Sequence, residues 1–522
     1  MTEDTMTLSA LLHHQADVFS EKTLFYYQNR SFSYGQVDEQ ASHVAAALKR
    51  LGVKKSDRIL VGLDNTPEEL VAFAAVARLG ALYIPVYTAF QVPEIAYFLH
   101  DSQAVAVIGS PDWIEKVKKC DTANRLKWVI QMGGTVDTSV IAWNELIQEP
   151  DRWSETVAGD DPLAIYYTSG TTGHPKGAVL LNQRFLHNAF RLKDQWHYTH
   201  DDVSVNTLSY THIFAPICEW FPLMACGGRF VLRNRFSPRG VLDDIRNYQA
   251  TFLCGVPSMY RLILDELMRK RTEQSFASMR FALVGGAPMP VPLQQEIETI
   301  MGIPFVQGYG QTESGPVVSI ELLDRPDGKH PGTCGTNKMF EDVQLRVIDQ
   351  RGKNVPPGEV GELLVHSPDI MAGYWNRPEI TKKTIRDGWL HTGDLARTDS
   401  DGYYYLVDRK KDLIITGGQN VYPAEVEKVL DHLSAIKDAA VIGLPDPVRG
   451  ESVAAYISLK EDAILTEQQV KNYCKNNLAE FKRPRQIHFI KSLPKTVSGK
   501  IRKGLLKAQI LDSPPGIIRK SE

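Results

Sequence analysis

The sequence is poor in several features that would assign it to a special class of protein. Its six cysteines are scattered and no two form a C-x-x-C pair, which argues against the common zinc and disulfide patterns and favours a reducing compartment. The most apolar run, 70–86, is interrupted by Arg78 and Gly80 and is too short to span a bilayer. A net charge of −3 provides no basic field for nucleic acid. We therefore expect a cytoplasmic protein with no transmembrane segment and no nucleic-acid partner.

Internal repeats and low-complexity segments are also missing, and 522 residues are too many for one core. Helices are predicted at 8–19 and 34–51. A predicted strand at 58–63, a helix at 67–79 and a strand at 81–86 then form a βαβ unit. This alternation predicts an α/β fold whose large N-terminal domain contains mainly parallel sheets.

The pattern changes near residue 331, where short alternating segments and turns predict a small β-rich subdomain. A charge cluster at 408–412 follows, and the remaining residues predict a compact α+β unit. The expected parts are an N-terminal domain over 1–408 with its β-rich subdomain at about 331–408, a hinge at 409–412, and a small C-terminal domain over 413–522.

One loop is unusually rich in groups that bind anions. Thr168–Gly177 contains four serine or threonine residues, three glycines and one lysine, between predicted strands at 163–167 and 178–181. Glycines let backbone N–H groups approach an anion, and the hydroxyls and Lys176 add donors and charge. Lys176 is not followed by Ser or Thr, so this is not a Walker A loop. The loop predicts polyphosphate binding, and a merely flexible hairpin loop is the alternative.

Two further strand ends carry residues suited to a nucleotide. One strand runs into 285–288, a surface poor in side chains where a planar ring can lie, and Tyr309 offers that ring an aromatic face. Thr312 supplies a hydroxyl suited to a phosphate, and Glu313 a carboxylate suited to Mg²⁺. An ordinary exposed charge is the alternative for Glu313.

The later part of the chain adds three candidates. The carboxylate of Asp394, after a short apolar run, is suited to the two hydroxyls of a ribose, which Arg409 could also reach. Lys500 follows Gly499 in a basic stretch, and a lysine there can neutralise charge on a phosphate. The alternatives are a turn aspartate for Asp394, a solvated linker for Arg409 and a soluble basic tail for Lys500.

Taken together, these segments resemble the adenylate-forming superfamily, which includes acyl-CoA synthetases, nonribosomal peptide adenylation domains and firefly-type luciferases. The resemblance covers nearly the whole chain. It rests on the order and spacing of five motifs, Thr168–Gly177, Tyr309–Glu313, Thr392–Asp394, Asp408–Asp412 and Gly499–Lys500. It implies a two-step reaction. A carboxylate attacks the α-phosphate of Mg·ATP, giving acyl-AMP and pyrophosphate, and the thiol of coenzyme A then attacks the acyl carbonyl and releases AMP.

The resemblance also implies roles for individual residues. Lys500 would bridge the carboxylate and the α-phosphate, while Thr168 and Lys176 would serve the outer phosphates. Glu313 would bind Mg²⁺. His212 stands where the family often has an aromatic residue or a histidine near the acyl carboxylate, with a packed core histidine as the alternative. The residues expected to bind ATP or coenzyme A are Thr168, Ser169, Gly170, Thr171, Thr172, Gly173, Lys176, Gly286, Ala287, Gln307, Gly308, Tyr309, Gly310, Thr312, Asp394, Arg409, Lys411, Gly417, Gly418 and Lys500.

In this family the small C-terminal domain is mobile and rotates between the two half-reactions. The hinge position falls on Lys411. After rotation, the loop with Gly417 and Gly418 would line the channel for pantetheine.

The acyl pocket is expected to be mostly apolar, with Glu219 and Cys254 as polar exceptions. This favours a fatty or other hydrophobic acid over an amino acid and leaves aryl acids open. Other readings are a stand-alone enzyme that loads a carrier protein, a luciferase-like oxygenase, and an inactive binding protein. The last would be expected to lose Lys176, Glu313 or Lys500, all of which are present. The sequence leaves a monomer and a dimer equally open.

Overall fold

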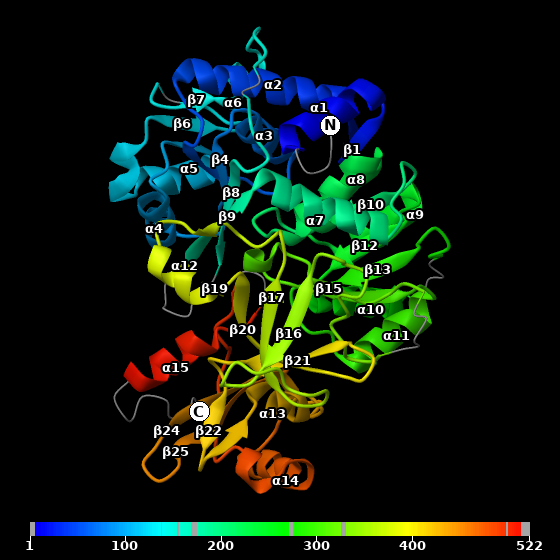
Figure 1. Cartoon of the computed structure of the whole chain (residues 1–522), viewed down its shortest axis with the longest axis vertical. Helices are drawn as coiled ribbons and strands as arrows, with labels where there is room; N and C mark the ends of the chain where they lie inside the picture. The colour runs from blue at the N-terminus through cyan, green and yellow to red at the C-terminus, as the bar shows by residue number, and fades with distance from the viewer. Residues whose placement is uncertain are drawn as a thin grey trace. The chain divides into compact units, whose positions relative to one another are not determined.

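A computed structural model of the chain describes residues 6–136, 138–153, 156–168, 175–270, 275–324, 330–496 and 500–512. These residues form two compact units, whose elements are labelled in Figure 1. The large unit takes in the described residues of Met1–Thr168, Lys176–Leu345 and Val365–Leu390, and the small unit those of Arg346–Leu364 and His391–Glu522.

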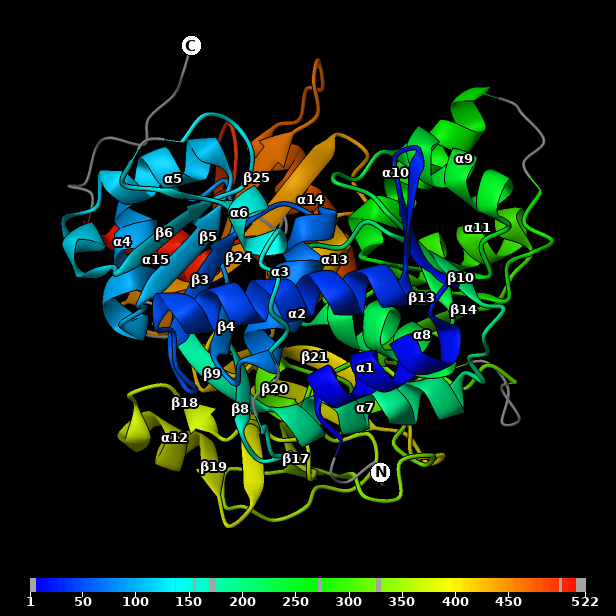
Figure 2. The ribbon, with the colours of Figure 1, turned by 90° about the horizontal axis from the view of Figure 1, so that it is seen from above.

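The large unit opens with two capped helices. α1 (Leu8–Phe19) begins after Thr7, whose hydroxyl caps the first turn. α2 (Tyr34–Leu51) begins in a capping box and ends at Gly52, which adopts the left-handed conformation. Both helices have the predicted bounds. They pack against each other and against α3 (Pro67–Arg78), as the view from above shows (Figure 2).

One eight-stranded sheet leads to the glycine-rich loop. Its order is β18-β9-β8-β4-β3-β5-β6-β7, with β8 to β7 parallel and β9 and β18 antiparallel to their neighbours. The predicted βαβ unit is confirmed, because β3 and β4 pair in parallel on either side of α3 in the sequence. The elements are β3 (Arg58–Gly62), β4 (Leu82–Pro85), α4 (Val92–Ser102), β5 (Ala106–Gly109), α5 (Pro111–Lys118), β6 (Trp128–Gln131), β7 (Ile141–Ala142), α6 (Trp143–Ile147), β8 (Pro162–Thr168), β9 (Lys176–Leu181), β18 (Gly373–Tyr374) and α12 (Pro378–Thr384).

A second eight-stranded sheet has the order β15-β14-β13-β12-β10-β11-β1-β2 and is parallel from β14 to β1. The carboxyl ends of β12, β13 and β14 therefore meet at one edge, where ligands bind in such sheets. The elements are β1 (Thr23–Tyr27), β2 (Arg30–Ser33), α7 (Asn182–Gln195), β10 (Val203–Asn206), α8 (Phe221–Cys226), β11 (Arg229–Leu232), α9 (Pro238–Tyr248), β12 (Phe252–Gly255), α10 (Pro257–Lys270), β13 (Phe281–Val284), α11 (Val291–Met301), β14 (Phe305–Tyr309) and β15 (Ser319–Ile320).

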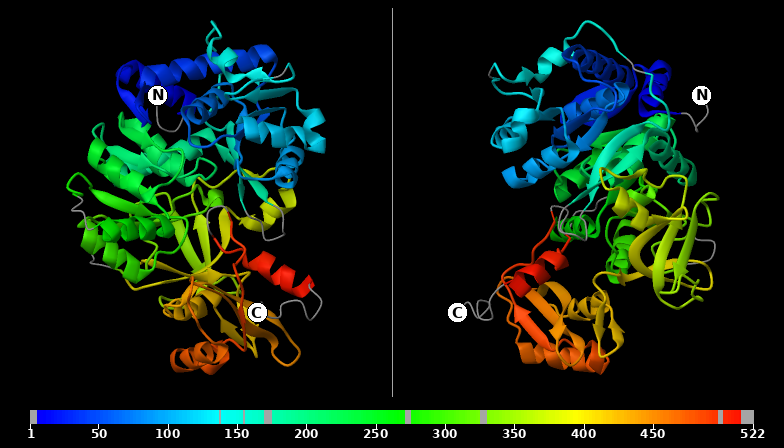
Figure 3. Two further views of the ribbon diagram at one scale, coloured as in Figure 1. Left: turned by 180° about the vertical axis from the view of Figure 1, so that it is seen from behind. Right: turned by 60° about the vertical axis from the view of Figure 1, so that its left-hand side comes forward.

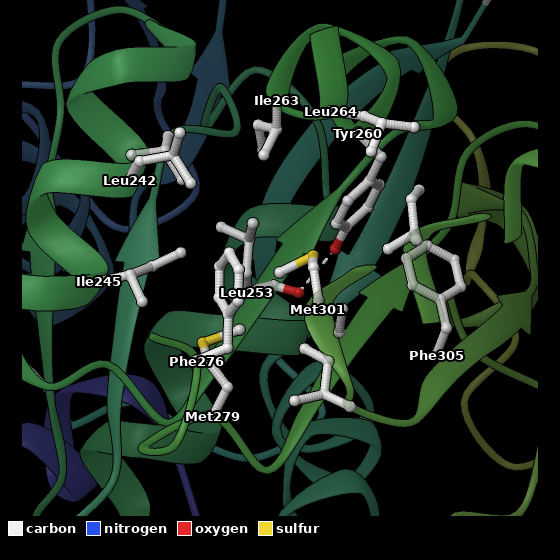
Figure 4. Close-up of a cluster of buried hydrophobic side chains, with 14 of the residues drawn as sticks. Leu242, Ile245, Leu253, Tyr260, Ile263, Leu264, Phe276, Met279, Met301 and Phe305 are labelled. Carbon is white, nitrogen blue, oxygen red and sulfur yellow. Dashed lines mark hydrogen bonds between the residues drawn. The ribbon is translucent and has the colours of Figure 1, made fainter. Parts of the chain in front are cut away.

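A buried cluster fastens α9, α10 and α11 to the strands of this edge (Figure 4). Ile245 and Phe305 lie within it, and the hydroxyl of Tyr260 donates to the carbonyl oxygens of Leu253, at 2.8 Å, and Leu283, at 2.7 Å. These two acceptors belong to β12 and β13. One helix side chain thus ties two adjacent strands together beneath the edge that they form.

The C-terminal body of the small unit is α+β and is shown from two further sides in Figure 3. Its sheet has the order β23-β22-β25-β24 with β26 beside β25, and its core includes Val426, Val441 and Val470. The β-rich segment forms another sheet, β16-β17-β20-β19 with β21 beside β20. The elements are β16 (Gln344–Ile348), β17 (Gly361–His366), β19 (Ile385–Arg386), β20 (Trp389–Thr398), β21 (Tyr404–Arg409), β22 (Ile414–Thr416), β23 (Gln419–Val421), α13 (Pro423–Leu430), β24 (Ile436–Asp446), β25 (Gly450–Leu459), α14 (Glu467–Asn477), β26 (Gln486–Phe489) and α15 (Lys503–Asp512).

The architecture confirms the predicted fold class. The residues 203–210 have a pattern that predicts a strand over the whole segment, and this is wrong in part, because β10 stops at Asn206. The side-chain amide of Asn206 donates to the hydroxyl of Tyr210 at 2.8 Å, and that of Asn65 donates to the carbonyl of Leu208 at 2.8 Å. These polar side chains hold a turn that leads into a π-helical stretch, Pro216–Trp220.

The helix α3 carries a buried acid. Glu69 of α3 is fully enclosed, and the hydroxyl of Tyr83 donates to its carboxyl group. Burial raises the pKa of Glu69 to about 8, although the Tyr83 hydrogen bond opposes the shift. The folded protein therefore keeps this carboxyl neutral at physiological pH.

We expect Glu69→Gln to make the free energy of unfolding less dependent on pH. In the unfolded chain this carboxyl loses its proton near pH 4.5, whereas in the folded chain it keeps it to about pH 8. The stability contributed by the proton is fully present below pH 4.5 and is lost as the pH rises through 8, at up to about 1.4 kcal/mol per pH unit. Thermal unfolding at about pH 5 and at about pH 8 should show that Glu69→Gln loses less stability between these two pH values than the wild type does. The control is Glu68→Gln on the same helix, and equal pH dependence of all three proteins would contradict the prediction.

Candidate active site

The described candidate residues fall into two sets, one in each unit. The large unit holds Thr168, Lys176, His212, Gly286, Ala287, Gln307, Gly308, Tyr309, Gly310, Thr312 and Glu313, and the small unit holds Asp394, Arg409, Lys411, Gly417, Gly418 and Lys500. Ser169, Gly170, Thr171, Thr172 and Gly173 lie outside the described residues.

The carboxylate of Glu313 is the centre of the first set. The hydroxyl of Thr168 donates to its Oε1 at 2.8 Å, and the hydroxyl of Tyr374 donates to the same oxygen at 2.9 Å. The ammonium of Lys176 lies 4.1 Å from the centre of the Tyr374 ring, a cation–π contact. Thr168 and Lys176 also pair across the base of the glycine-rich loop. A carboxylate, a hydroxyl and a cation therefore gather where the loop begins and ends.

Tyr374 was missed by the sequence analysis. It lies 61 residues after Glu313, in the short strand β18, and β18 joins the sheet beside β9. A glycine–tyrosine pair alone does not indicate a site. The sequence shows only a tyrosine in a short extended segment at this position. Tyrosines are common in strands, so this feature does not indicate a site.

The turn that carries Glu313 is fixed by its neighbours. A Cβ at Gly310 would overlap the carbonyl oxygen of Pro316, so only glycine fits there. The amide of Gln311 donates to the hydroxyl of Ser314 at 2.8 Å, and the amide of Ser314 donates back to the Gln311 carbonyl at 3.1 Å. These bonds close a single 3₁₀ turn around Glu313.

The expected adenine surface lies at the meeting strand ends of β13 and β14. Val284 and Gln307 are paired residues of these parallel strands, and Gly286 has a φ of +76°. The side-chain carbonyl of Gln307 accepts a hydrogen bond from the Met289 amide at 3.3 Å, which holds the chain after β13 against β14. Gly286 is exposed and Tyr309 is buried. The structure thus brings the glycine surface and the tyrosine strand together.

His212 is exposed, so it is not a packed core histidine. Its ring and that of Tyr87 meet edge to face with 6.0 Å between their centres. The ring of Phe214 lies over Gly285, where an added Cβ would come within 3.0 Å of it. Phe214 thus forms an aromatic wall beside the end of β13, two residues after His212 in the sequence.

Glu219 and Trp220 are buried in the core of the large unit. Trp220 packs on Phe73 and Tyr210, with ring centres 5.6 and 5.7 Å away. Glu219 is fully enclosed, and burial raises its pKa well above the usual range of a glutamate. An enclosed carboxyl group whose pKa is raised by burial is a poor partner for an ammonium group.

In the small unit Asp394 and Arg409 pair across β20 and β21, and their side chains form an ion pair at 2.9 Å. Asp394 is buried, and its amide donates to the Thr392 hydroxyl at 3.0 Å. Lys500 lies in the field of this pair. Desolvation and the Arg409 charge lower the pKa of Lys500, and Asp394 acts in the opposite direction. The three residues thus form one local group of charges.

Gly417 and Gly418 form the two-residue loop between β22 and β23, and Thr416 and Gln419 pair across it. Their φ values are +56° and +78°, as in a type I′ hairpin turn. Apart from the neighbouring residues in the chain, no heavy atom of the described residues lies within 4 Å of a Cβ added at either glycine. Lys411 is exposed in the turn after β21.

Comparison with known proteins identifies the family. The model of the AMP-binding enzyme family matches residues 12–375, and that of the AMP-binding enzyme C-terminal domain matches 425–500. The chain belongs to the AMP-binding enzyme family. This enzyme is an AMP-forming acid–thiol ligase that uses ATP and works through an acyl adenylate.

Similar proteins align over almost their whole length. Feruloyl-CoA synthase from Amycolatopsis sp is 34% identical over 91% of this chain and 93% of its own. Long-chain-fatty-acid–CoA ligase FadD13 from Mycobacterium tuberculosis is 33% identical over 92% and 94%. Among solved structures, ATP-bound MatB from Rhodopseudomonas palustris has a TM-score of 0.87 and 30% identity over 97% of this chain and 99% of its own. Anthranilate CoA ligase AuaEII with anthranoyl-AMP has a TM-score of 0.87 and 26% identity over 98% and 99%.

Among the helices that the structure describes, none has the length and apolar character needed to cross a membrane.

We expect Tyr374→Phe to slow acyl-adenylate formation by about 10- to 100-fold, because it removes one hydrogen bond to the Glu313 carboxylate and keeps the ring beneath Lys176. The measurement is acid-dependent exchange of pyrophosphate into ATP. The control is Tyr405→Phe, which removes a hydroxyl that donates to Asp399 at 2.9 Å in the small unit. The same rate in Tyr374→Phe and the wild type would contradict the prediction.

Proposed function

We propose that the enzyme activates a hydrophobic carboxylic acid and transfers its acyl group to coenzyme A. A carboxylate oxygen bonds to the α-phosphorus of ATP while the bond to the β-phosphate oxygen breaks, and pyrophosphate leaves. The thiol sulfur of coenzyme A then bonds to the acyl carbon while the bond to the AMP oxygen breaks, and the thiol proton goes to solvent. The observation that carries the proposal is the Glu313 carboxylate held by the Thr168 and Tyr374 hydroxyls beside Lys176.

The residues of the large unit serve the outer phosphates and the acid. Lys176 and the hydroxyl of Thr168 offset the charge that leaves as pyrophosphate. His212 and Phe214 lie at the acyl end. The Glu313 carboxylate and the Thr168 hydroxyl are the hard oxygen donors that Mg²⁺ prefers, so these residues fit the ion, which would supply further positive charge at the phosphates.

The residues of the small unit serve the ribose and the reacting phosphate. The buried carboxylate of Asp394, oriented by Arg409, binds the ribose hydroxyls. Lys500 neutralises the repulsion between the acid and the α-phosphate in the first half-reaction. The loop at Gly418 borders the pantetheine arm in the second, and Lys411 is the hinge between the two stages.

The acid is proposed to be hydrophobic, either fatty or aromatic. Glu219 is fully enclosed in the core, which argues against an amino acid, because its carboxyl group is not exposed to an ammonium group. The Phe214 wall over Gly285 suits apolar contacts. Similar proteins carry names for both kinds of acid, feruloyl-CoA synthase and long-chain-fatty-acid–CoA ligase.

Incubation with ATP, Mg²⁺, coenzyme A and a panel of fatty, aromatic and amino acids tests the proposal. AMP and a thioester of a hydrophobic acid are expected. AMP without thioester would favour the alternative acceptor, the pantetheine thiol of a carrier protein. Release of ADP in place of AMP would contradict the mechanism.

We expect Lys500→Ala to slow acyl-AMP formation by about 100- to 1,000-fold, because a positioned positive charge at the reacting phosphate is lost. Thioester formation from supplied acyl-AMP and coenzyme A should keep a rate near that of the wild type. The two half-reactions are measured separately, as pyrophosphate release and as thioester. Lys495→Ala is the control, since Lys495 pairs with Asp438 at 2.7 Å in the same segment. Equal loss in both half-reactions would argue against this role.

We expect Gly418→Leu to reduce thioester formation at least about tenfold more than acyl-AMP formation, because a side chain in the hairpin loop would obstruct the pantetheine arm. Gly352→Leu is a matched control. Gly352 has a φ of +81°, close to the +78° of Gly418, and a Cβ added at either position meets no atom within 4 Å from the described residues beyond its chain neighbours. Both variants therefore place a leucine at nearly the same positive φ, where an L residue is strained. If the two leucine variants behave alike, strain and not obstruction explains the loss.

A further inference from the structure

A buried ion cluster lies in the large unit around Asp369. The side chain of Asp369 is 0% exposed, and it accepts hydrogen bonds from three residues of α7. These are His187 through Nδ1 at 2.7 Å, Asn188 through Nδ2 at 3.3 Å and Arg191 through Nη1 at 2.8 Å. The bond with Asp369 raises the pKa of His187, which favours its cationic form. A buried carboxylate without partners costs free energy. The three hydrogen bonds to α7 therefore favour one position for the Asp369 side chain.

The residues that follow Asp369 form hydrogen bonds with α7, with the turn that carries Glu313 and with β9. Arg184 of α7 donates to the carbonyl of Ile370 at 2.6 Å. The amide of Met371 donates to the carbonyl of Glu313 at 3.0 Å, and that of Ala372 to the carbonyl of Val179 in β9 at 2.9 Å. We call residues 369–374 the strap. It connects α7 to the Glu313 turn and to the strand that begins at Lys176.

Both ends of the strap touch the Glu313 region. At its far end, the Tyr374 hydroxyl donates to the Glu313 carboxylate, and the Tyr374 ring contacts Lys176. At its near end, a Cβ on Gly315 would overlap the backbone carbonyl of Asp369. The turn that carries Glu313 is therefore in direct contact with the residue that anchors the strap.

We propose that Asp369 is a positioning residue for the phosphate and Mg²⁺ end of the site, acting through the strap on Glu313 and Lys176. It touches no substrate itself. Its three bonds to α7 fix where the strap begins, and the strap fixes the Tyr374 hydroxyl and ring. Ligands of a metal or phosphate must be held within about 0.5 Å of their working geometry, so a loosened anchor weakens binding at this end only. The inference rests on the proposed roles of Glu313 and Lys176.

The test is calorimetric titration of the full-length protein with ATP and Mg²⁺, with ATP in EDTA, and with AMP. In Asp369→Asn we expect the Kd of Mg·ATP to rise about tenfold, because the amide cannot pair with both His187 and Arg191. The Kd of AMP, which lacks the outer phosphates, should stay within about twofold of the wild-type value. If Asp369 only stabilised the fold, Asp369→Asn would have a lower unfolding temperature, and the Kd values of Mg·ATP and AMP would change by the same factor.

Asp342→Asn is the matched control. Asp342 pairs with the same Arg191 at 2.6 Å and lies 3.6 Å from His187, but its side chain is 39% exposed and it lies outside the strap. Its Mg·ATP affinity should equal that of the wild type. If Asp369→Asn does not fold, His187→Ala removes one donor and should shift the Kd of Mg·ATP in the same direction by a smaller factor.

Unchanged Mg·ATP affinity in the folded variants, or an equal rise for AMP, would overturn the positioning role. Failure of the wild-type protein to bind Mg·ATP at all would instead overturn the proposed function on which the inference rests.

Discussion

One oxygen of the Glu313 carboxylate accepts hydrogen bonds from two hydroxyls that are far apart in the sequence, those of Thr168 and Tyr374. This arrangement needs β8 to end at Thr168, the glycine-dependent turn to present Glu313, and β18 to join the sheet beside β9. Each requirement belongs to a different part of the large unit. Residues from the sheet, the turn and the strap thus contact one carboxylate oxygen of Glu313. Phosphate chemistry requires that charge at this point be placed accurately.

Three buried acids of the large unit show how surroundings decide what a carboxyl does. Burial raises the pKa of Glu69 and of Glu219, and neither carboxyl group forms an ion pair within the described part of the chain. Asp369 is equally buried but has His187 and Arg191 as partners, so it forms an ion cluster. The first two fill polar positions of the core, whereas the third anchors a segment that reaches the active site. Their chemistry is the same, and only the partners differ.

Local patterns were enough to predict much of the fold. The caps and periodicity of 8–19 and 34–51 determine helices with those bounds, because such signals act within one or two turns. The pattern at 203–210 predicts a strand beyond Asn206, where the structure has a turn. The Asn65 side chain, 143 residues before Leu208, donates to the Leu208 carbonyl there, and no local pattern contains that contact. Domain bounds, the hinge at Lys411 and the ligand roles remain predictions.

The sequence by itself determined the family and the motifs, because glycine, hydroxyl, carboxylate and lysine groups at fixed spacing carry the chemistry in their own side chains. The tertiary structure alone decided which groups meet. It brought Tyr374 to Glu313, placed His212 at the surface, and enclosed Glu219 in a core that raises its pKa. The physical reason is that hydrogen bonds and burial between distant segments depend on how sheets and helices pack, and a linear pattern records only what each residue offers.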